Sequence, residues 1–115
     1  MTHDPVPDLS TLEFHVLLAL AAEPLYGYAL KDAISTESGG MLTPRAGSLY
    51  RVVARLMGDG LVKTAEPVDA EPHPGLERKY YALTQRGHRV LAAEAQRLKH
   101  AVATAERRLN ASRGS

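Results

Sequence analysis

Apolar residues recur along the C-terminal part of the chain in a regular alternation of four and three positions. The residues of this pattern are Leu91, Ala95, Leu98, Val102, Ala105 and Leu109. In an α-helix this spacing aligns them on one stripe, as at the a and d positions of a coiled coil. Because the stripe is longer than a small domain can cover, it predicts a dimerisation helix over residues 85–110. Packing of the stripe across the first helix of the same chain is the alternative.

The length of 115 residues leaves room for one hydrophobic core, because domains usually contain about 100–150 residues. The hydrophobic fraction of 44% is typical of a folded protein. We therefore expect one domain over residues 9–84 ahead of the helix. Residues 1–8 and 111–115 are expected to be flexible ends.

Several classes of protein are excluded by composition. The chain contains no cysteine, which removes disulfides, thiolate metal sites and cysteine nucleophiles. No apolar run is long enough to span a bilayer, and the first eight residues do not resemble a signal peptide. We therefore expect a cytoplasmic protein with no membrane partner.

The net charge of +1 conceals an uneven distribution. Residues 1–40 carry one basic and six acidic side chains. Residues 41–89 carry eight basic and five acidic side chains, and residues 90–115 carry five basic and two acidic side chains. The basic surplus after residue 40 suggests a polyanionic partner for that part of the chain.

The first helix is predicted from Ser10 to Glu23. Ser10 and Glu13 have the spacing of a capping box, in which each side chain accepts a hydrogen bond from the other residue's amide. The apolar residues of this helix, Leu12 among them, point in many directions, so the helix is expected to be buried on more than one side. This indicates either a subunit interface that includes Leu12 or the central helix of a monomeric core.

Two further helices are predicted before residue 60. The second begins near Tyr26–Tyr28 and ends at Ser38, where two glycines follow. The third begins at Thr43–Pro44 and reaches about Met57. Its apolar positions, Leu49, Val52, Val53 and Leu56, share one face, whereas Ser48, Arg51 and Arg55 lie on the other.

Two strands are predicted after the third helix, over residues 61–65 and 78–83, joined by a proline-rich loop. The fold class is thus mainly α with a small β-hairpin, in the element order of a winged helix-turn-helix. In that fold the third helix enters the major groove of DNA and the wing contacts the flanking backbone.

The basic residues of this arrangement suit double-stranded DNA. Arginine offers a planar fork of donors for guanine or phosphate, and hydroxyl groups donate to phosphate or base edges. The candidate DNA-binding residues are Arg45, Ser48, Tyr50, Arg51, Arg55, Lys63, Arg78 and Lys79. An ordinary solvated helix face is the alternative for the arginines, and Tyr50 either contacts the DNA backbone or covers the edge of the core.

Nothing in the sequence indicates catalysis. No nucleophile elbow, phosphate-binding glycine loop or paired histidine motif is present. Asp69, Glu71, His73 and Glu77 gather near the wing tip and could bind a cation, but a solvated loop explains them better. We expect no enzyme activity, no cofactor and no metal site.

Several motifs resemble the PadR family of transcriptional regulators over about residues 9–109. These motifs are Leu25-Tyr26-Gly27-Tyr28-Ala29-Leu30, Gly47-Ser48-Leu49-Tyr50 with Leu56 and Gly60-Leu61-Val62, and Arg78-Lys79-Tyr80-Tyr81-Ala82-Leu83-Thr84 with Gly87. The resemblance implies a winged-helix homodimer, usually a repressor, whose C-terminal helices pack across the two-fold axis against the partner's first helix. The short C-terminal part is similar to the branch with a single C-terminal helix.

The chain departs from its relatives in two respects. Some members of the branch bind flat molecules between aromatic residues at the dimer centre, whereas this chain has no tryptophan. The sequence therefore allows a small-molecule effector but does not identify it. Arg51 stands where many relatives have proline. The sequence predicts a homodimeric repressor on an inverted-repeat operator, with a winged-helix protein-interaction module and an effector-sensing dimer as alternatives.

Overall fold

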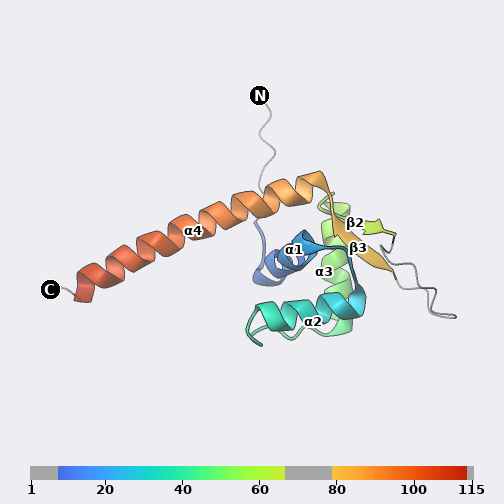
Figure 1. Ribbon diagram of the computed structural model, residues 1–115, viewed down its shortest axis with the longest axis horizontal. Coiled ribbons are helices and arrows are strands. Elements are labelled where there is room, and N and C mark those ends of the chain that lie inside the picture. The colour runs from blue at the N-terminus through green and yellow to red at the C-terminus, as the bar shows by residue number, and fades with distance from the viewer. Residues whose placement is uncertain (1–7, 67–78, 114–115) are drawn as a thin grey trace, which may run out of the picture.

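The computed structural model describes residues 8–66 and 79–113, which form helices around a small antiparallel sheet (Figure 1). The elements are α1 (Thr11–Ala22), β1 (Leu25–Tyr26), α2 (Gly27–Glu37), α3 (Ala46–Gly58), β2 (Val62–Ala65), β3 (Tyr80–Leu83) and α4 (Gln85–Arg113). Three helices precede the β2–β3 hairpin and a long helix follows it. The predicted fold class is confirmed.

Helix α1 begins where the capping box predicts. The Ser10 amide donates to Glu13 Oε1 at 2.8 Å, and the Glu13 amide donates to Ser10 Oγ at 3.1 Å. The helix contacts α2, α3, α4 and β3, and Figure 1 shows it between α2 and α4. These contacts within one chain explain why its apolar residues point in many directions.

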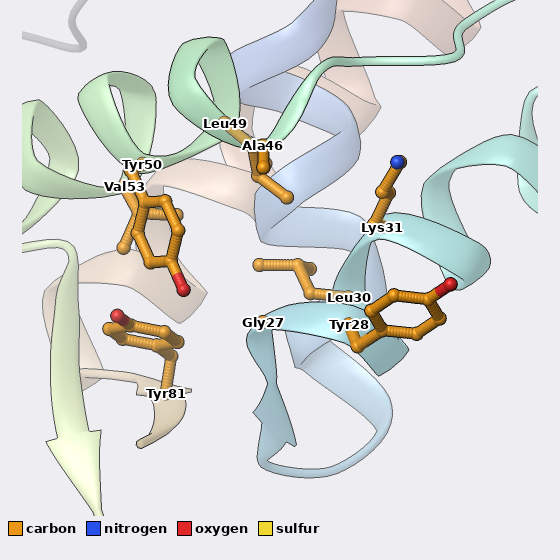
Figure 2. A pocket seen from close by; sticks show the side chains of 9 residues that line it. All are labelled: Gly27, Tyr28, Leu30, Lys31, Ala46, Leu49, Tyr50, Val53 and Tyr81. Carbon is orange, nitrogen blue, oxygen red and sulfur yellow. The ribbon is translucent and has the colours of Figure 1, made fainter. Parts of the chain in front are cut away.

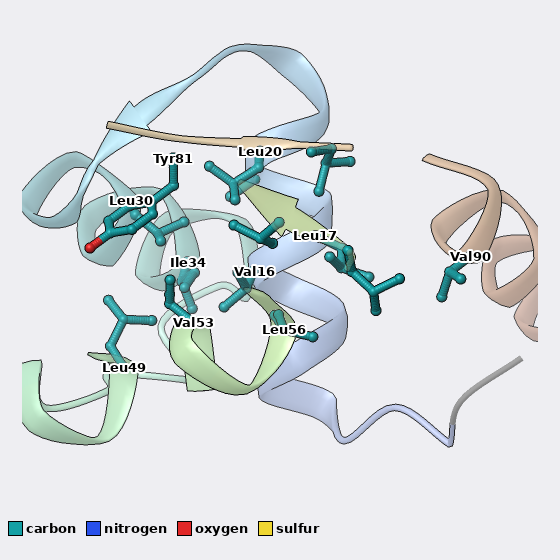
Figure 3. Packing of buried hydrophobic residues seen from close by; sticks show 14 residues of the cluster. Val16, Leu17, Leu20, Leu30, Ile34, Leu49, Val53, Leu56, Tyr81 and Val90 are labelled. Atoms are coloured by element: carbon teal, nitrogen blue, oxygen red, sulfur yellow. The ribbon is translucent and has the colours of Figure 1, made fainter. Parts of the chain in front are cut away.

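The core gathers around α1 and draws on every helix. Its members are Val16, Leu17, Ala19, Leu20, Leu30, Ile34, Leu49, Val53, Leu56, Leu61, Val62, Tyr81, Leu83 and Val90. Figure 3 shows Leu30, Ile34 and Tyr81 on one side of Val16, and Val90 of α4 on the other. The first turns of α4 thus belong to the same core as the helix-turn-helix.

The third helix begins later than the sequence suggested. It starts at Ala46 with Arg45 as N-cap, in place of a start at Thr43–Pro44. Residues 42–45 are not helical and lead into this cap. Instead, the Leu42 amide donates to Ser38 Oγ at 2.9 Å, and Leu42 packs against the core.

The sheet has a third strand that the sequence did not reveal. Its order is β1-β3-β2, with Leu25 opposite Tyr81 and Val62 opposite Leu83. Strand β1 contains only two residues, too few for any alternation of polar and apolar side chains to be recognised. The hairpin itself is confirmed, with β3 beginning at Tyr80.

Helix α4 is anchored at its start by a close backbone approach. The Thr84 hydroxyl donates to the Gly60 carbonyl at 2.6 Å and accepts from the Gly87 amide at 3.0 Å, as an N-cap does. A Cβ added at Gly87 would overlap the carbonyl oxygen of Leu61. Only glycine therefore permits this contact between α4 and the residue before β2.

Beyond its first turns α4 extends away from the rest of the molecule (Figure 1). The helix continues to Arg113, so residues 111–113, which were expected in a flexible end, are helical. From residue 99 to residue 113 every described side chain except Thr104 is exposed.

Replacing Gly87 by alanine should lower the free energy of unfolding by at least about 2 kcal/mol, because the added methyl group displaces either α4 or Leu61. Urea denaturation followed by circular dichroism measures the change. Gly47→Ala is the matched control, since a Cβ at Gly47 meets no atom within 4 Å. Equal stability of Gly87→Ala and the wild-type protein would show that the close approach is not required.

Candidate nucleic-acid interface

Helix α3 presents two chemically distinct faces. Leu49, Val53 and Leu56 are buried in the core. Ser48, Arg51 and Arg55 are exposed on the opposite side. Because the buried stripe fixes the rotation of the helix, the hydroxyl and both guanidinium groups are held toward solvent. The division into faces predicted from the spacing is confirmed.

The exposed face of α3 is positively charged and carries no opposing acid. The helix contains two arginines and no aspartate or glutamate. Arg51 Nε donates to the Gly47 carbonyl at 3.4 Å, a weak contact that leaves the other guanidinium donors available. Within residues 8–66 and 79–113, no ion pair involves Arg45, Arg51, Arg55, Lys63 or Lys79.

The N-terminus of α3 adds backbone donors to this face. Arg45, the N-cap residue, makes no capping hydrogen bond with its side chain. The amides of the first turn therefore lack a side-chain acceptor, and such amides favour an anion. Arg45 is exposed beside them.

The wing contributes two exposed lysines to the described surface. Lys63 lies on β2 opposite Ala82, and Lys79 lies immediately before β3. Arg78 and the cluster of Asp69, Glu71, His73 and Glu77 lie outside the described residues. Tyr50 of α3 is 59% exposed, and its hydroxyl lies 3.4 Å from the position of a Cβ added at Gly27 of α2.

The residues predicted for dimerisation divide into two groups. Leu12 and Leu91 are half-buried and pack against the core of their own chain, and Leu98 is half-buried as well. Ala95, Val102, Ala105 and Leu109 are exposed, Val102 by 55% and Leu109 by 63%. The first part of the stripe is therefore partly covered within the chain, and the later part is not.

A cavity of about 100 Å³ lies between α2, α3 and β3. The sequence pattern did not predict it. Figure 2 shows the side chains that line it: Tyr28, Leu30, Lys31, Ala46, Leu49, Tyr50, Val53 and Tyr81, with Gly27 at the start of α2. Residues of three motifs from the sequence analysis line it: Gly27 and Tyr28, Leu49 and Tyr50, and Tyr81.

Tyr81 is the most buried aromatic residue of this cavity, at 5% exposure. Burial, and to a lesser degree the neighbouring Tyr50, raises the pKa of its phenol above the usual 10.0. The group therefore stays neutral and able to donate a hydrogen bond over the physiological range.

These observations define a winged helix-turn-helix protein: a core-anchored third helix with a basic outer face, followed by a two-stranded wing. The sequence matches the transcriptional regulator PadR-like family over residues 16–93. The chain belongs to this family of transcriptional regulators.

Solved structures share the fold. A PadR family regulator from Clostridium difficile is 22% identical, with a TM-score of 0.70 over 87% of this chain and 99% of that one. A PadR-like regulator from Bacillus cereus is 24% identical, with a TM-score of 0.70 over 85% of this chain and 90% of that one. PadR of Bacillus subtilis, solved in complex with operator DNA, is 22% identical, with a TM-score of 0.63 over 75% of this chain and 47% of that one.

A curated relative carries a similar sequence within a longer protein. A protein of a Streptomyces fradiae transposon is 42% identical over 80 residues, which are 70% of this chain and 21% of that protein. The chain thus spans about a fifth of that relative's length.

Two findings concern other classes of site. No helix in the described part of the chain is long and apolar enough to cross a membrane. Residues 8–66 and 79–113 contain no group of three or more histidine, aspartate or glutamate side chains that could hold a metal ion.

The raised pKa of Tyr81 predicts a loss of stability in alkali. Below about pH 10 the phenol is neutral in both the folded and the unfolded chain, and above it the unfolded chain ionises first. The free energy of unfolding should then fall as the pH rises, more steeply for the wild-type protein than for Tyr81→Phe. Urea denaturation at pH 8 and at about pH 10.5 measures both. Parallel behaviour of the two proteins would contradict the assignment.

Proposed function

We propose that the protein is a homodimeric repressor that recognises an inverted-repeat operator by inserting α3 into the major groove. One observation carries the proposal: the outer face of α3 holds Ser48, Arg51 and Arg55 exposed and free of acidic partners. A protein of the same fold, PadR of Bacillus subtilis, was solved in complex with operator DNA, which supports DNA as the partner.

The side chains of α3 have the chemistry for reading base edges. An arginine can donate two parallel hydrogen bonds to O6 and N7 of guanine. Ser48 and Tyr50 can donate to phosphate oxygens or base edges, and the amides at the start of α3 can hold a phosphate. Arg45, Lys63, Lys79 and, outside the described residues, Arg78 are proposed as phosphate contacts.

The exposed end of α4 supports the homodimer. Val102, Ala105 and Leu109 continue the apolar stripe beyond the core of their own chain. A second α4, together with the partner's α1 near Leu12, would cover this stripe. Two α3 helices related by the two-fold axis would then meet major grooves about 34–36 Å apart, one turn of DNA.

Arginines of α3 and lysines of the wing should affect DNA binding differently. Arg51→Ala or Arg55→Ala should weaken binding to a selected operator by about 1–3 kcal/mol, with less effect on random DNA. Lys63→Ala should weaken both alike, because a phosphate contact carries no sequence information. Fluorescence anisotropy with labelled duplexes measures both affinities.

Arg113→Ala is the control for this series, since Arg113 is exposed at the far end of α4. For the wild-type dimer, log affinity against log salt should have a slope of about −5 to −9, from roughly six to ten phosphate contacts. If Arg51→Ala, Arg55→Ala and Lys63→Ala all lost affinity for operator and random DNA equally, α3 would contact only the DNA backbone. No binding to any duplex would favour a protein-interaction module.

Val102→Glu should convert the dimer to a folded monomer. Val102 is 55% exposed in the single chain, so the charge is tolerated there, whereas at the proposed dimer interface it is buried without a partner. Analytical ultracentrifugation gives the mass, and circular dichroism confirms the fold. Ala103→Glu, one position off the stripe, should remain dimeric. A Val102→Glu dimer of unchanged affinity would exclude this interface.

A further inference from the structure

Ser48 combines an exposed side chain with a hydroxyl that is free of protein partners. It lies on the outer face of α3, and in the described part of the chain its hydroxyl forms no hydrogen bond. The hydroxyls of Ser10 and Ser38, by contrast, accept backbone amides at 3.1 and 2.9 Å. The hydroxyl of Ser48 is therefore accessible to an enzyme as well as to DNA.

Basic side chains flank Ser48 on both sides in the sequence. Arg45 precedes it by three residues, Arg51 follows it by three, and a leucine comes directly after it. Both arginines are exposed, and residues 38–58 contain no aspartate or glutamate. Protein kinases that prefer basic substrates bind an arginine three residues ahead of the serine through carboxylates of their own. The segment around Ser48 has the chemistry of a substrate for such a kinase.

The first turn of α3 is held weakly. Its N-cap, Arg45, makes no capping hydrogen bond with its side chain, so the turn lacks the stabilisation that a cap supplies. At Gly47 neither packing nor a positive φ requires glycine, and glycine favours a helix less than alanine does. Residues 42–45, ahead of the helix, are not helical. Opening of this one turn would present residues 43–48 as an extended segment, the form in which kinases bind substrates.

We propose that Ser48 is the acceptor of a serine/threonine protein kinase that prefers basic substrates, and that its phosphorylation releases the operator. The release of DNA rests on the proposed function. The kinase transfers the γ-phosphoryl group of ATP to Ser48 Oγ. A P–O ester bond forms, the bond between the γ-phosphorus and ADP breaks, and the hydroxyl proton passes to a base of the kinase. Hydrolysis of the ester by a phosphatase restores the serine and yields inorganic phosphate.

The phosphate cancels the positive charge of the surface that faces DNA. It carries a charge of about −1.5 to −2 at pH 7, whereas α3 contributes only the two charges of Arg51 and Arg55. Arg51 lies three residues after Ser48, a spacing at which side chains of a helix meet, so it pairs with the phosphate and not with DNA. A negative group in the first turn of a helix is favourable, so the fold is retained.

Phosphorylation of the full chain without DNA tests the site directly. The catalytic subunit of cyclic-AMP-dependent protein kinase, which prefers arginine ahead of the serine, is supplied with ATP, and tandem mass spectrometry locates the phosphate. Ser48 should be modified, and Arg45→Ala should lower the initial rate by at least about tenfold, because a charge-assisted contact is lost. Gly47→Ala should slow the reaction about fivefold, because alanine closes the first turn. No phosphate at Ser48, or an unchanged rate in Arg45→Ala, would overturn the proposal.

Genetic incorporation of phosphoserine at position 48 measures the effect on DNA. By fluorescence anisotropy in about 0.1 M salt, this chain should bind a selected operator at least about a hundredfold more weakly than the wild type. Ser48→Ala removes the hydroxyl without adding charge and should cost at most about tenfold. Phosphoserine at position 112, in the last turn of α4, is the matched control and should bind as the wild type does. Equal losses for phosphoserine at position 48 and for Ser48→Ala would overturn the proposal.

Two further readouts separate this regulation from the proposed function. Circular dichroism should show the same helix content with and without the phosphate at Ser48, and an unfolded phosphoprotein would overturn the proposed mechanism. The selected operator should slow phosphorylation of the wild type, because bound DNA covers α3. If the phosphorylated chain binds the operator as the wild type does, the regulation fails while the proposed function stands. If no duplex binds but Ser48 is phosphorylated, the proposed function fails while the modification site stands.

Discussion

The packing of one stripe of α3 against the core determines what the rest of the molecule can do. Leu49, Val53 and Leu56 are buried together with Val16 and Leu17 of α1. Burial of several such side chains is worth roughly 1.5–3 kcal/mol each, far more than an exposed arginine gains from any one orientation. The apolar stripe therefore sets the rotation of α3. The basic face is turned outward as a consequence and needs no interaction of its own to hold it there.

The same core connects the long helix to the wing. Val90 places the first turns of α4 in the cluster around α1, and Gly87 lets the helix touch the backbone of Leu61 just before β2. A dimer formed along the outer part of α4 would thus hold both wings and both α3 helices at fixed separations.

Sequence periodicity was sufficient for the helices and for the faces of α3, because a stripe of apolar residues has few ways to be buried. It failed where the determining contacts join residues distant in the chain. The two residues of β1 pair with Tyr80 and Tyr81, and the cavity needs α2, α3 and β3 together. The sequence predicts too early a start for α3, because Thr43 and Pro44 are residue types that favour the first positions of a helix. In the structure Leu42 packs against the core, and the helix begins only after Arg45.

Site-directed cleavage tests most directly whether α3 lies in the major groove of a two-fold symmetric complex. The chain has no cysteine, so Ala54→Cys, exposed on α3, can carry one iron chelate per chain, with Ala103→Cys on α4 as the control. The account predicts cleavage of a selected operator at two positions about 10 base pairs apart from the α3 label, and none from the α4 label. A single cleavage position, or cleavage from α4 alone, would contradict it.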